Sequence, residues 1–258
     1  MSERLSSGLR DFLLGEGSMR KALEDCVMKI YSGAAPASAN DAVTGVLLAT
    51  ITKASGAVSA GERSTPRAYE IVISGTITTG NTVSLNVTVD GVGPTANTYT
   101  ILAADSTRIL IAAKVARMLN DLPQISAIPD IDDATGVIYV QGRIDGLDLT
   151  IADVPGTCTT TVTAKQAAAR SDAMYFAAPS AGAMSKASET WSGLIATSGV
   201  AGYFRFVTSS DDGTLSTTQV RAQGAVSTSG AELNLSNTSL VAATTLTIDT
   251  YSISLPAE

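Results

Sequence analysis

Carboxylates are the side chains best placed to do chemistry in this sequence, because the chain contains no histidine. Histidine is the usual base near neutral pH and the commonest metal ligand. Asp130, Asp132 and Asp133 lie within four residues, and further aspartates follow downstream. Clustered carboxylates can bind Ca²⁺ through oxygen, but the spacing is not that of an EF-hand and its closing Glu is missing. We favour a solvated turn, with a metal site at these three residues as the alternative.

Sequence motifs for catalysis or cofactor binding are also missing. The chain has no G-x-S-x-G elbow, no P-loop and no paired-cysteine zinc spacing. Gly91 and Gly93 are followed by Pro94, which is typical of a turn rather than of a phosphate-binding loop. We therefore expect no catalytic residue, no cofactor and no enzymatic activity. Asp211 and Asp212 are interpreted as the soluble tip of a hairpin.

Two arginines are candidates for contact with a partner. In residues 202–207, Phe204 and Phe206 share one face of an alternating strand, whereas Tyr203 and Arg205 share the other. Residues 219–226 resume the alternation and place Arg221 on the same outward face as Arg205. We expect Tyr203, Arg205 and Arg221 to form an interface, although arginines more often pair with carboxylates of their own sheet.

Composition limits the partners that the chain can have. The net charge of −7 argues against nonspecific binding to nucleic acid, which needs basic side chains to displace counterions. No segment approaches the eighteen apolar residues of a membrane span, and the first residues lack the apolar run of a secretory signal. We expect synthesis in a cytoplasm and no membrane partner. Cys26 and Cys158 lie far apart, so we expect both to be buried and reduced rather than bridged.

The N-terminal segment also carries candidate interface residues, and short helices must hold them in place. Residues 8–14 and 18–24 predict two short helices, with Ser18 as the N-cap of the second. Leu9, Phe12 and Leu13 share a face of the first helix. Because helices of two turns are marginal alone, this face must dock on its own sheet, which we favour, or on a neighbouring subunit. Strands are predicted at 26–32 and 46–52, the second buried on both faces at its start.

A different pattern begins after residue 66. Strands are predicted at 69–73, 83–89 and 98–102, and then a helix that is capped by Asp105 or Ser106 and ends before Pro123. Two further strands, 137–140 and 147–151, with a possible third at 159–163, complete a β-β-β-α-β-β unit. Trp191 and the alternating strands between residues 190 and 255 then return to the first pattern; Trp191 is expected in the core, with an interface anchor as the alternative. A change of phase near Asp249 or Thr250 predicts a β-bulge.

The fold class is therefore mainly β. Residues 1–65 and 171–258 are predicted to form a discontinuous, jelly-roll-like β-sandwich with short N-terminal helices. An inserted β-β-β-α-β-β domain at 66–170 interrupts it, at a loop where an insertion costs the host few contacts.

Several segments resemble small structural proteins of tailed bacteriophages. They are LRDFLLGEGS at 9–18, KIYSG at 29–33 with Pro36, TG at 44–45, LLATI at 47–51, AGYFRF at 201–206 and QGAVSTSGAELNL at 223–235. The resemblance covers residues 1–60 and 175–258, about half the chain. The 66–170 segment is similar to β-rich accessory domains of phage head and tail proteins.

The resemblance implies a virion component. Among such components we expect a capsid cement or decoration protein, present on the particle as a homo-oligomer, whose partners are the phage major capsid protein and other copies of itself. A short N-terminal segment suited to docking and polar sheet faces without catalytic groups favour this interpretation. A tail-tube or tail-tip subunit is the alternative within the class, and a carbohydrate-binding adhesin is the alternative from another class.

Overall fold

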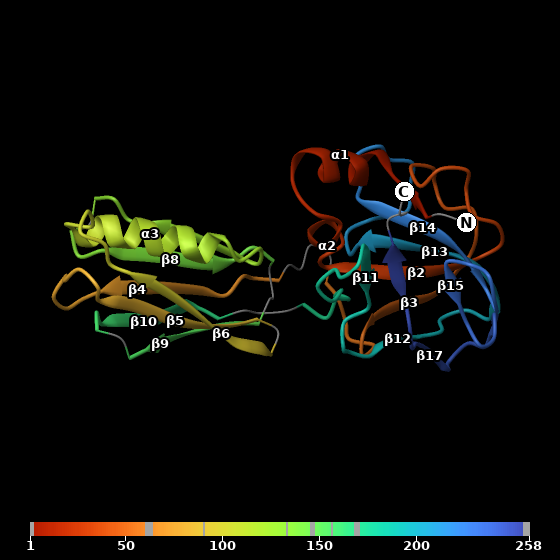
Figure 1. The fold of residues 1–258 in the computed structure, drawn as a ribbon. Helices are drawn as coiled ribbons and strands as arrows, with labels where there is room; N and C mark the ends of the chain where they lie inside the picture. Colours follow the sequence, from red (N-terminus) through yellow and green to blue (C-terminus); the bar gives the residue numbers. More distant parts are fainter. Residues whose placement is uncertain are drawn as a thin grey trace. The chain divides into compact units, whose positions relative to one another are not determined.

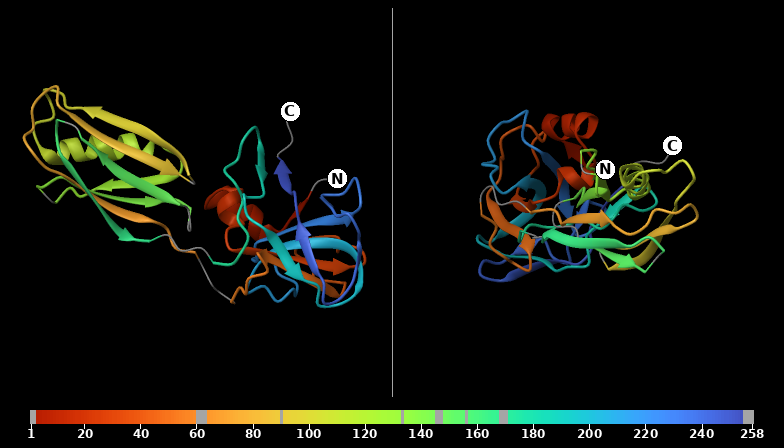
Figure 2. Two further views of the ribbon diagram at one scale, coloured as in Figure 1. Left: turned by 90° about the horizontal axis from the view of Figure 1, so that it is seen from below. Right: turned by 90° about the vertical axis from the view of Figure 1, so that its left-hand side faces the viewer.

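The computed structural model describes residues 3–59, 64–89, 91–132, 134–144, 148–155, 157–167 and 171–254. The chain is mainly β, with several antiparallel sheets, and it divides into two compact units. One unit comprises Met1–Glu62 and Ser171–Glu258, and the other comprises Arg63–Arg170. In Figures 1 and 2 the first unit contains the red and blue segments and the second contains the yellow and green ones. No helix in the described parts of the chain is long and apolar enough to cross a membrane.

The N-terminal segment of the first unit packs on the unit's own core. It comprises strand β1 (Arg4–Leu5) and helices α1 (Ser7–Gly15) and α2 (Met19–Ala22). Ser6 caps α1 by accepting a hydrogen bond from the Leu9 amide (3.1 Å), and Ser18 caps α2, as predicted. Leu9 is fully buried in the core, while Phe12 and Leu13 pack against it at partial burial. Tertiary packing therefore stabilises helices that are too short to be stable alone.

A nine-stranded sheet is the main element of the first unit. Its strand order is β1-β14-β13-β2-β3-β12-β17, with β15 added beside β14 and β16 beside β13. Their bounds are β2 (Cys26–Ser32), β3 (Leu47–Lys53), β12 (Trp191–Leu194), β13 (Gly199–Thr208), β14 (Arg221–Ser227), β15 (Leu233–Asn234), β16 (Ser239–Leu240) and β17 (Thr245–Ile248). The predicted antiparallel pairing of β13 with β14 is confirmed, with Phe206 opposite Ala222. Since β2 lies between β13 and β3, segments far apart in sequence share this sheet.

Aromatic side chains fill the core of the first unit. Phe204 and Phe206 are fully buried and meet edge to face, with ring centroids 5.6 Å apart. Trp191, Phe176 and Tyr251 join the same cluster. The expectation that Trp191 is a core residue is confirmed, because its side chain has no exposed surface.

The change of phase near Asp249 separates two strands that belong to two sheets. Strand β17 ends at Ile248 in the large sheet, whereas β18 (Ser252–Ser254) pairs with β11 (Ala183–Ser185) in a separate two-stranded ribbon. Ile248, Tyr251 and Ile253 are all buried, so the chain keeps its apolar residues inside while it passes between the sheets. The predicted β-bulge is wrong, because the connection at Asp249–Tyr251 interrupts the strand completely.

The second unit holds two sheets and one long helix. The order of the four-stranded sheet is β10-β4-β8-β7, and that of the three-stranded sheet is β6-β5-β9. The bounds are β4 (Ala68–Ile73), β5 (Thr82–Val89), β6 (Val92–Thr100), α3 (Arg108–Asn120), β7 (Ile125–Pro129), β8 (Val137–Gly142), β9 (Leu149–Val154) and β10 (Thr160–Gln166). Ile111, Val115 and Leu119 of α3 are buried in a core that both sheets share.

Two local predictions for the second unit are wrong. Thr107, not Asp105 or Ser106, caps α3, because its hydroxyl accepts a hydrogen bond from the Leu110 amide (3.3 Å). The Asp105 carboxylate instead accepts from the Leu102 amide (2.8 Å), which closes the turn before the helix. Strand β7, which follows the turn at residues 121–124, was not predicted, so the unit is β-β-β-α-β-β-β-β.

Candidate functional site

The predicted outward row of the first unit is buried. Tyr203, Arg205 and Arg221 each have no more than trace exposure, so the expectation of an exposed interface at these residues is wrong. They do share one face of β13 and β14, as the alternation requires. Two connections cover that face: residues 33–46 between β2 and β3, and residues 209–220 between β13 and β14. A period-two pattern shows which residues share a face but not which loops fold over it.

Backbone carbonyls of the 33–46 connection accept hydrogen bonds from the buried cations, although Arg205 Nη1 is buried without a hydrogen-bond partner. Arg221 Nη1 donates to the carbonyl oxygen of Asn40 (3.3 Å), and Arg205 Nη2 donates to that of Ser38 (3.4 Å). Gln223 Nε2 donates to the carbonyl of Pro36 (2.8 Å), which also accepts from Arg4 Nη1 (2.7 Å). Most of these buried donors are therefore paired with the loop rather than offered to a partner.

A buried ion pair anchors the second connection. Asp211 accepts two hydrogen bonds from Arg221, at 2.6 Å to Nε and 3.0 Å to Nη2, and both side chains are almost completely buried. Asp211 is therefore not the soluble tip that the sequence suggests. Asp212 is the exposed residue of the two; its carboxylate accepts from the Thr214 amide (2.9 Å), which lowers the pKa of Asp212. The pair makes this face a closed polar core with a structural role.

Two stacked tyrosines, a glutamine and a lysine complete this polar core. The rings of Tyr31 and Tyr203 stack with centroids 5.0 Å apart, and Arg205 Nε donates to Gln223 Oε1 (2.7 Å). Lys29 Nζ donates to the Asp211 carbonyl (2.7 Å), and burial lowers the pKa of Lys29. The stacked rings shield the charges from water, which strengthens each polar contact.

Two of the candidate metal residues, Asp130 and Asp132, are joined by a local hydrogen bond. The Asp130 carboxylate accepts a hydrogen bond from the Asp132 amide (3.0 Å), and both residues are at least partly exposed. Asp133 lies outside the described residues. Among those that are described, no group of three or more His, Cys, Asp or Glu side chains is placed to hold a metal ion.

The cysteines lie in different units. Cys26 is in the core of the first unit and Cys158 is in that of the second, and both are free thiols with little exposure. Burial raises the pKa of both. Their predicted reduced state is the one in the structure.

Several exposed apolar side chains lie on three adjoining segments of the first unit. These segments are bonded through their backbones: Ala196 donates to the Leu48 carbonyl (2.8 Å), and Ala243 donates to that of Ile195 (2.9 Å). We call the exposed apolar residues on them the apolar end surface: Val46, Leu47, Leu194, Val200 and Val241. Sequence reasoning missed this surface. The only signal was the apolar run at the start of β3, which was predicted to be buried on both faces, whereas Leu47 and Val46 are exposed.

The N-terminal helix contributes little to an exposed surface. Of the candidates, Leu9 is fully buried and Phe12 and Leu13 pack on the core, so the face that they share is turned toward the helix's own unit. Leu14, which the sequence did not single out, is the exposed apolar residue of α1 (88% exposed).

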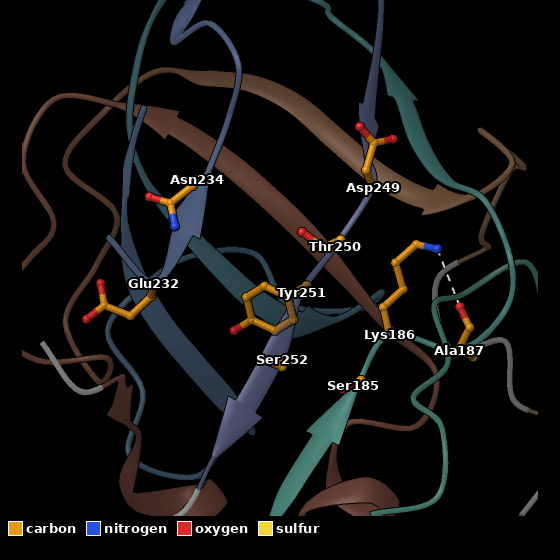
Figure 3. Close-up of a pocket in the computed structure, with 9 residues that line it drawn as sticks. All are labelled: Ser185, Lys186, Ala187, Glu232, Asn234, Asp249, Thr250, Tyr251 and Ser252. Atoms are coloured by element: carbon orange, nitrogen blue, oxygen red, sulfur yellow. Dashed lines mark hydrogen bonds between the residues drawn. The ribbon is translucent and has the colours of Figure 1, made fainter. Parts of the chain in front are cut away.

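A polar pocket of about 520 Å³ lies beside the two-stranded ribbon of the first unit (Figure 3). Charged and amide groups line it from three segments, namely Lys186, Glu232, Asn234 and Asp249. The remaining lining residues are Ser185, Ala187, Thr250, Tyr251 and Ser252. Lys186 Nζ donates to the carbonyls of Ala187 (3.4 Å) and Glu189, and lies 5.9 Å from the Trp191 ring centroid. The pocket thus presents both hydrogen-bond donors and acceptors.

No protein-family model matches the sequence, and a search of curated proteins also gives no match.

Proposed function

We propose that this chain is a structural protein of a tailed-bacteriophage virion, and that it acts as a capsid cement protein that bridges neighbouring capsomers. In this proposal residues 1–65 and 171–258 form a jelly-roll-like β-sandwich that contacts the capsid. Residues 66–170 form an inserted accessory domain. The proposal assigns the chain a binding role and no catalytic one. Its partners are the major capsid protein and other copies of the chain.

The apolar end surface is the observation that supports this proposal. Exposed apolar side chains scattered singly are normal, but a group on adjoining segments is typical of a protein–protein contact. Here the group lies on a chain with only 16% charged residues, so few charged side chains oppose its burial against a partner. A contact of standard size buries about 800 Å² per partner, and a lattice repeats it many times. Modest affinity at each contact is therefore sufficient for a cement protein.

Binding to heads tests the role of the surface. Purified chain should cosediment with phage heads that lack it, and the double variant Val200→Ser, Val241→Ser should bind at least about tenfold more weakly, since each buried Val contributes roughly 1.5 kcal/mol or more. Ile128→Ser is the matched control, because Ile128 is a similarly exposed apolar residue of the second unit. Equal binding by the double variant and the control would contradict the assigned surface.

Electron microscopy distinguishes heads from tails. A small label inserted beside Gly230, where the loop is exposed and no other atom lies within 4 Å of an added Cβ, should not disturb the fold. If the chain is a cement protein, the label should lie over the heads of complete particles. Label restricted to tails would favour the tail-tube or tail-tip subunit instead.

The polar pocket is the specific observation that favours the carbohydrate-binding alternative. Sugar hydroxyls need donors and acceptors together, and this pocket offers an amide, hydroxyls and carboxylates. A glycan array with the wild-type chain tests it, with Asp249→Asn plus Asn234→Ala as the pocket variant and Asp212→Asn as the exposed control. Signal that the pocket variant loses and the control keeps would establish the adhesin class. If none of the three proteins gave a signal on the array, the adhesin alternative would be excluded.

A further inference from the structure

Strand β6 forms a free edge of the three-stranded sheet in the second unit. Among the described strands only β5 pairs with it, and this pairing sets Ser84 opposite Thr98. A register shift and Pro94 interrupt the regular pairing near the start of β6. Residues 95–100 are therefore the regular part of this edge.

Alternate residues of this segment direct their backbone groups away from the sheet. Just beyond β6, the Ile101 amide donates to the Asn81 carbonyl (2.8 Å), so residue 101 is bonded toward the side of β5. The bonded side alternates along an antiparallel strand, so the other odd-numbered residues of the segment also bond toward β5. Ala96, Thr98 and Thr100 then present their N–H and C=O groups at the free edge. These groups are able to pair with a further strand.

The edge is uncharged and held in an extended form. Residues 95–100 have the sequence TANTYT, which contains no charged side chain. On the outer face of the sheet, the hydroxyls of Thr98 and Ser84 share a hydrogen bond (3.0 Å). From the inner face, the Tyr99 hydroxyl donates to the Asp105 carboxylate (2.5 Å). Both contacts order the strand before a partner binds, which lowers the entropic cost of pairing.

Other sheet edges in the described parts of the chain are protected in ways that residues 95–100 are not. Strand β10 carries Lys165 and a register shift, β7 ends at Pro129, and β1 and β17 have only two and four residues. At the far edge of the three-stranded sheet, Asp153 of β9 accepts a hydrogen bond from Thr160 of β10. Short strands, prolines, lysines and bulges are the usual means of preventing edge-to-edge pairing. The unprotected segment of β6 is thus the edge best suited to pairing.

We propose that residues 95–100 pair with the same segment of a second copy of this chain, antiparallel and about a two-fold axis at Thr98. In this register Thr98 lies opposite its own counterpart, and Ala96 lies opposite the counterpart of Thr100. Each of these pairs exchanges two backbone hydrogen bonds. The two three-stranded sheets then form one continuous sheet across an isologous interface.

Charge favours a second copy as the occupant of this edge. The chain carries a net charge of −7, so most contacts between two copies bring like charges together. An uncharged strand facing itself avoids this repulsion, and Thr–Thr pairs are favourable across antiparallel strands. One strand edge buries less than the roughly 800 Å² per partner of a standard interface, so the dimer is weak in solution. The inference rests on the proposed function for the crowding of copies on one particle, which compensates for weak pairing.

Sedimentation equilibrium of the intact chain tests the pairing. Wild type should pass from monomer toward dimer between about 10 µM and about 1 mM, the range expected of a weak interface. Thr98→Lys and Thr98→Glu should each weaken the dimer by at least about tenfold, because like charges then lie directly opposite each other. An equimolar mixture of the two variants should dimerise again, since opposite charges then meet across the axis.

Thr150→Lys is the matched control. Thr150 is an exposed threonine on the same outer face, on β9 at the other edge of the sheet, and this variant should dimerise as wild type does. Hydrogen exchange of wild type needs no substitution: protection of residues 95–100 should increase with protein concentration.

Three results would overturn the proposed pairing. They are a wild-type chain that stays monomeric at about 1 mM, whether its edge is solvated or takes a strand of another protein, a Thr98→Lys variant that dimerises as well as the control, and a mixture of the two charged variants that stays monomeric. Head binding through Val200 and Val241 is measured separately, so a monomeric chain that still binds heads would contradict this inference and leave the proposed function intact.

Discussion

Arg221 and Asp211 form the contact on which the covered face of the sheet most depends. Their two hydrogen bonds, of 2.6 and 3.0 Å, join strand β14 to the connection that precedes it. A buried ion pair contributes little net stability compared with apolar residues, but removal of one partner leaves a buried charge without compensation. The pair therefore fixes the path of the 209–220 connection more than it adds to the stability of the sheet.

Asp211→Asn should lower the free energy of unfolding by about 3 to 5 kcal/mol, because it leaves the Arg221 guanidinium buried without a counter-charge. Urea unfolding at pH 7 measures the change. The neighbouring Asp212→Asn is the control and should cost less than about 1 kcal/mol, since Asp212 is exposed and Asn can still accept from Thr214. Equal losses for the two variants would show that the Arg221 contact is dispensable.

Glu3 should make the stability of the whole chain depend on pH. Its pKa is about 8 in the folded chain and 4.5 when exposed, so the folded state binds more protons between these values. Stability therefore falls as pH rises from about 4.5 to about 8 and then levels off. We expect a loss of roughly 1 to 3 kcal/mol over this range. Thermal unfolding across this range should show the slope in wild type and a smaller slope in Glu3→Gln. The same pH dependence in both proteins would show that groups other than Glu3 cause it.

At the scale of elements, the alternation of β13 and β14 predicted their pairing and the inward position of Phe204 and Phe206 correctly. The alternation also led to the wrong prediction that the opposite face is exposed, because Tyr203 and Arg205 are polar side chains. Their burial depends on carbonyl groups of a distant loop, and backbone acceptors leave no trace in the pattern of side chains. The same limit hid the apolar end surface, since hydrophobicity alone does not distinguish Leu48, which is buried, from Leu47, which is not.

The start of α3 shows a second limit. Asp105, Ser106 and Thr107 are consecutive residues, each chemically able to cap a helix. The choice among them depends on Leu102, whose amide engages the Asp105 carboxylate and leaves the cap to Thr107. Because of this contact, the helix starts one or two residues later than the sequence predicts. A difference of this size is usual for helix boundaries.

Phe204→Ala should lower the free energy of unfolding by about 3 to 5 kcal/mol, because it removes a fully buried ring that contacts both Phe206 and Tyr251. Val200→Ala on the same strand is the control. Val200 is 61% exposed, so its truncation should change stability by less than about 0.5 kcal/mol. Chemical denaturation of both variants gives the comparison, and a near-neutral Phe204→Ala would mean that the aromatic cluster is not the core of β13.

At the scale of the whole molecule, each unit has a hydrophobic core of its own. The core of the second unit includes Ile71, Leu85 and Val115 and draws on both of its sheets and on α3. The two stretches of the first unit are joined through β2, β3 and the strands after residue 183, so neither stretch completes the large sheet by itself. The units therefore differ in what each needs in order to fold.

A fragment of residues 64–167 should fold cooperatively on its own, because its core is complete within that segment. A sigmoidal thermal transition and dispersed amide signals in an NMR spectrum would be the expected result. A fragment of residues 171–258 should fail the same test, since it lacks β2 and β3 from the middle of its sheet. A folded 171–258 fragment would show that these two strands are not required for the fold of the first unit.

The main chain of the loop over the polar core accepts the hydrogen bonds from the buried donors below it. Successive carbonyl groups from Pro36 to Asn40 accept hydrogen bonds from Arg4, Arg205, Arg221 and Gln223. Every residue type supplies a carbonyl, so the donors below constrain the route of this segment while leaving exposed positions such as Ala37 open to substitution. Related chains could therefore carry different side chains at the exposed positions of this loop while its path stays fixed.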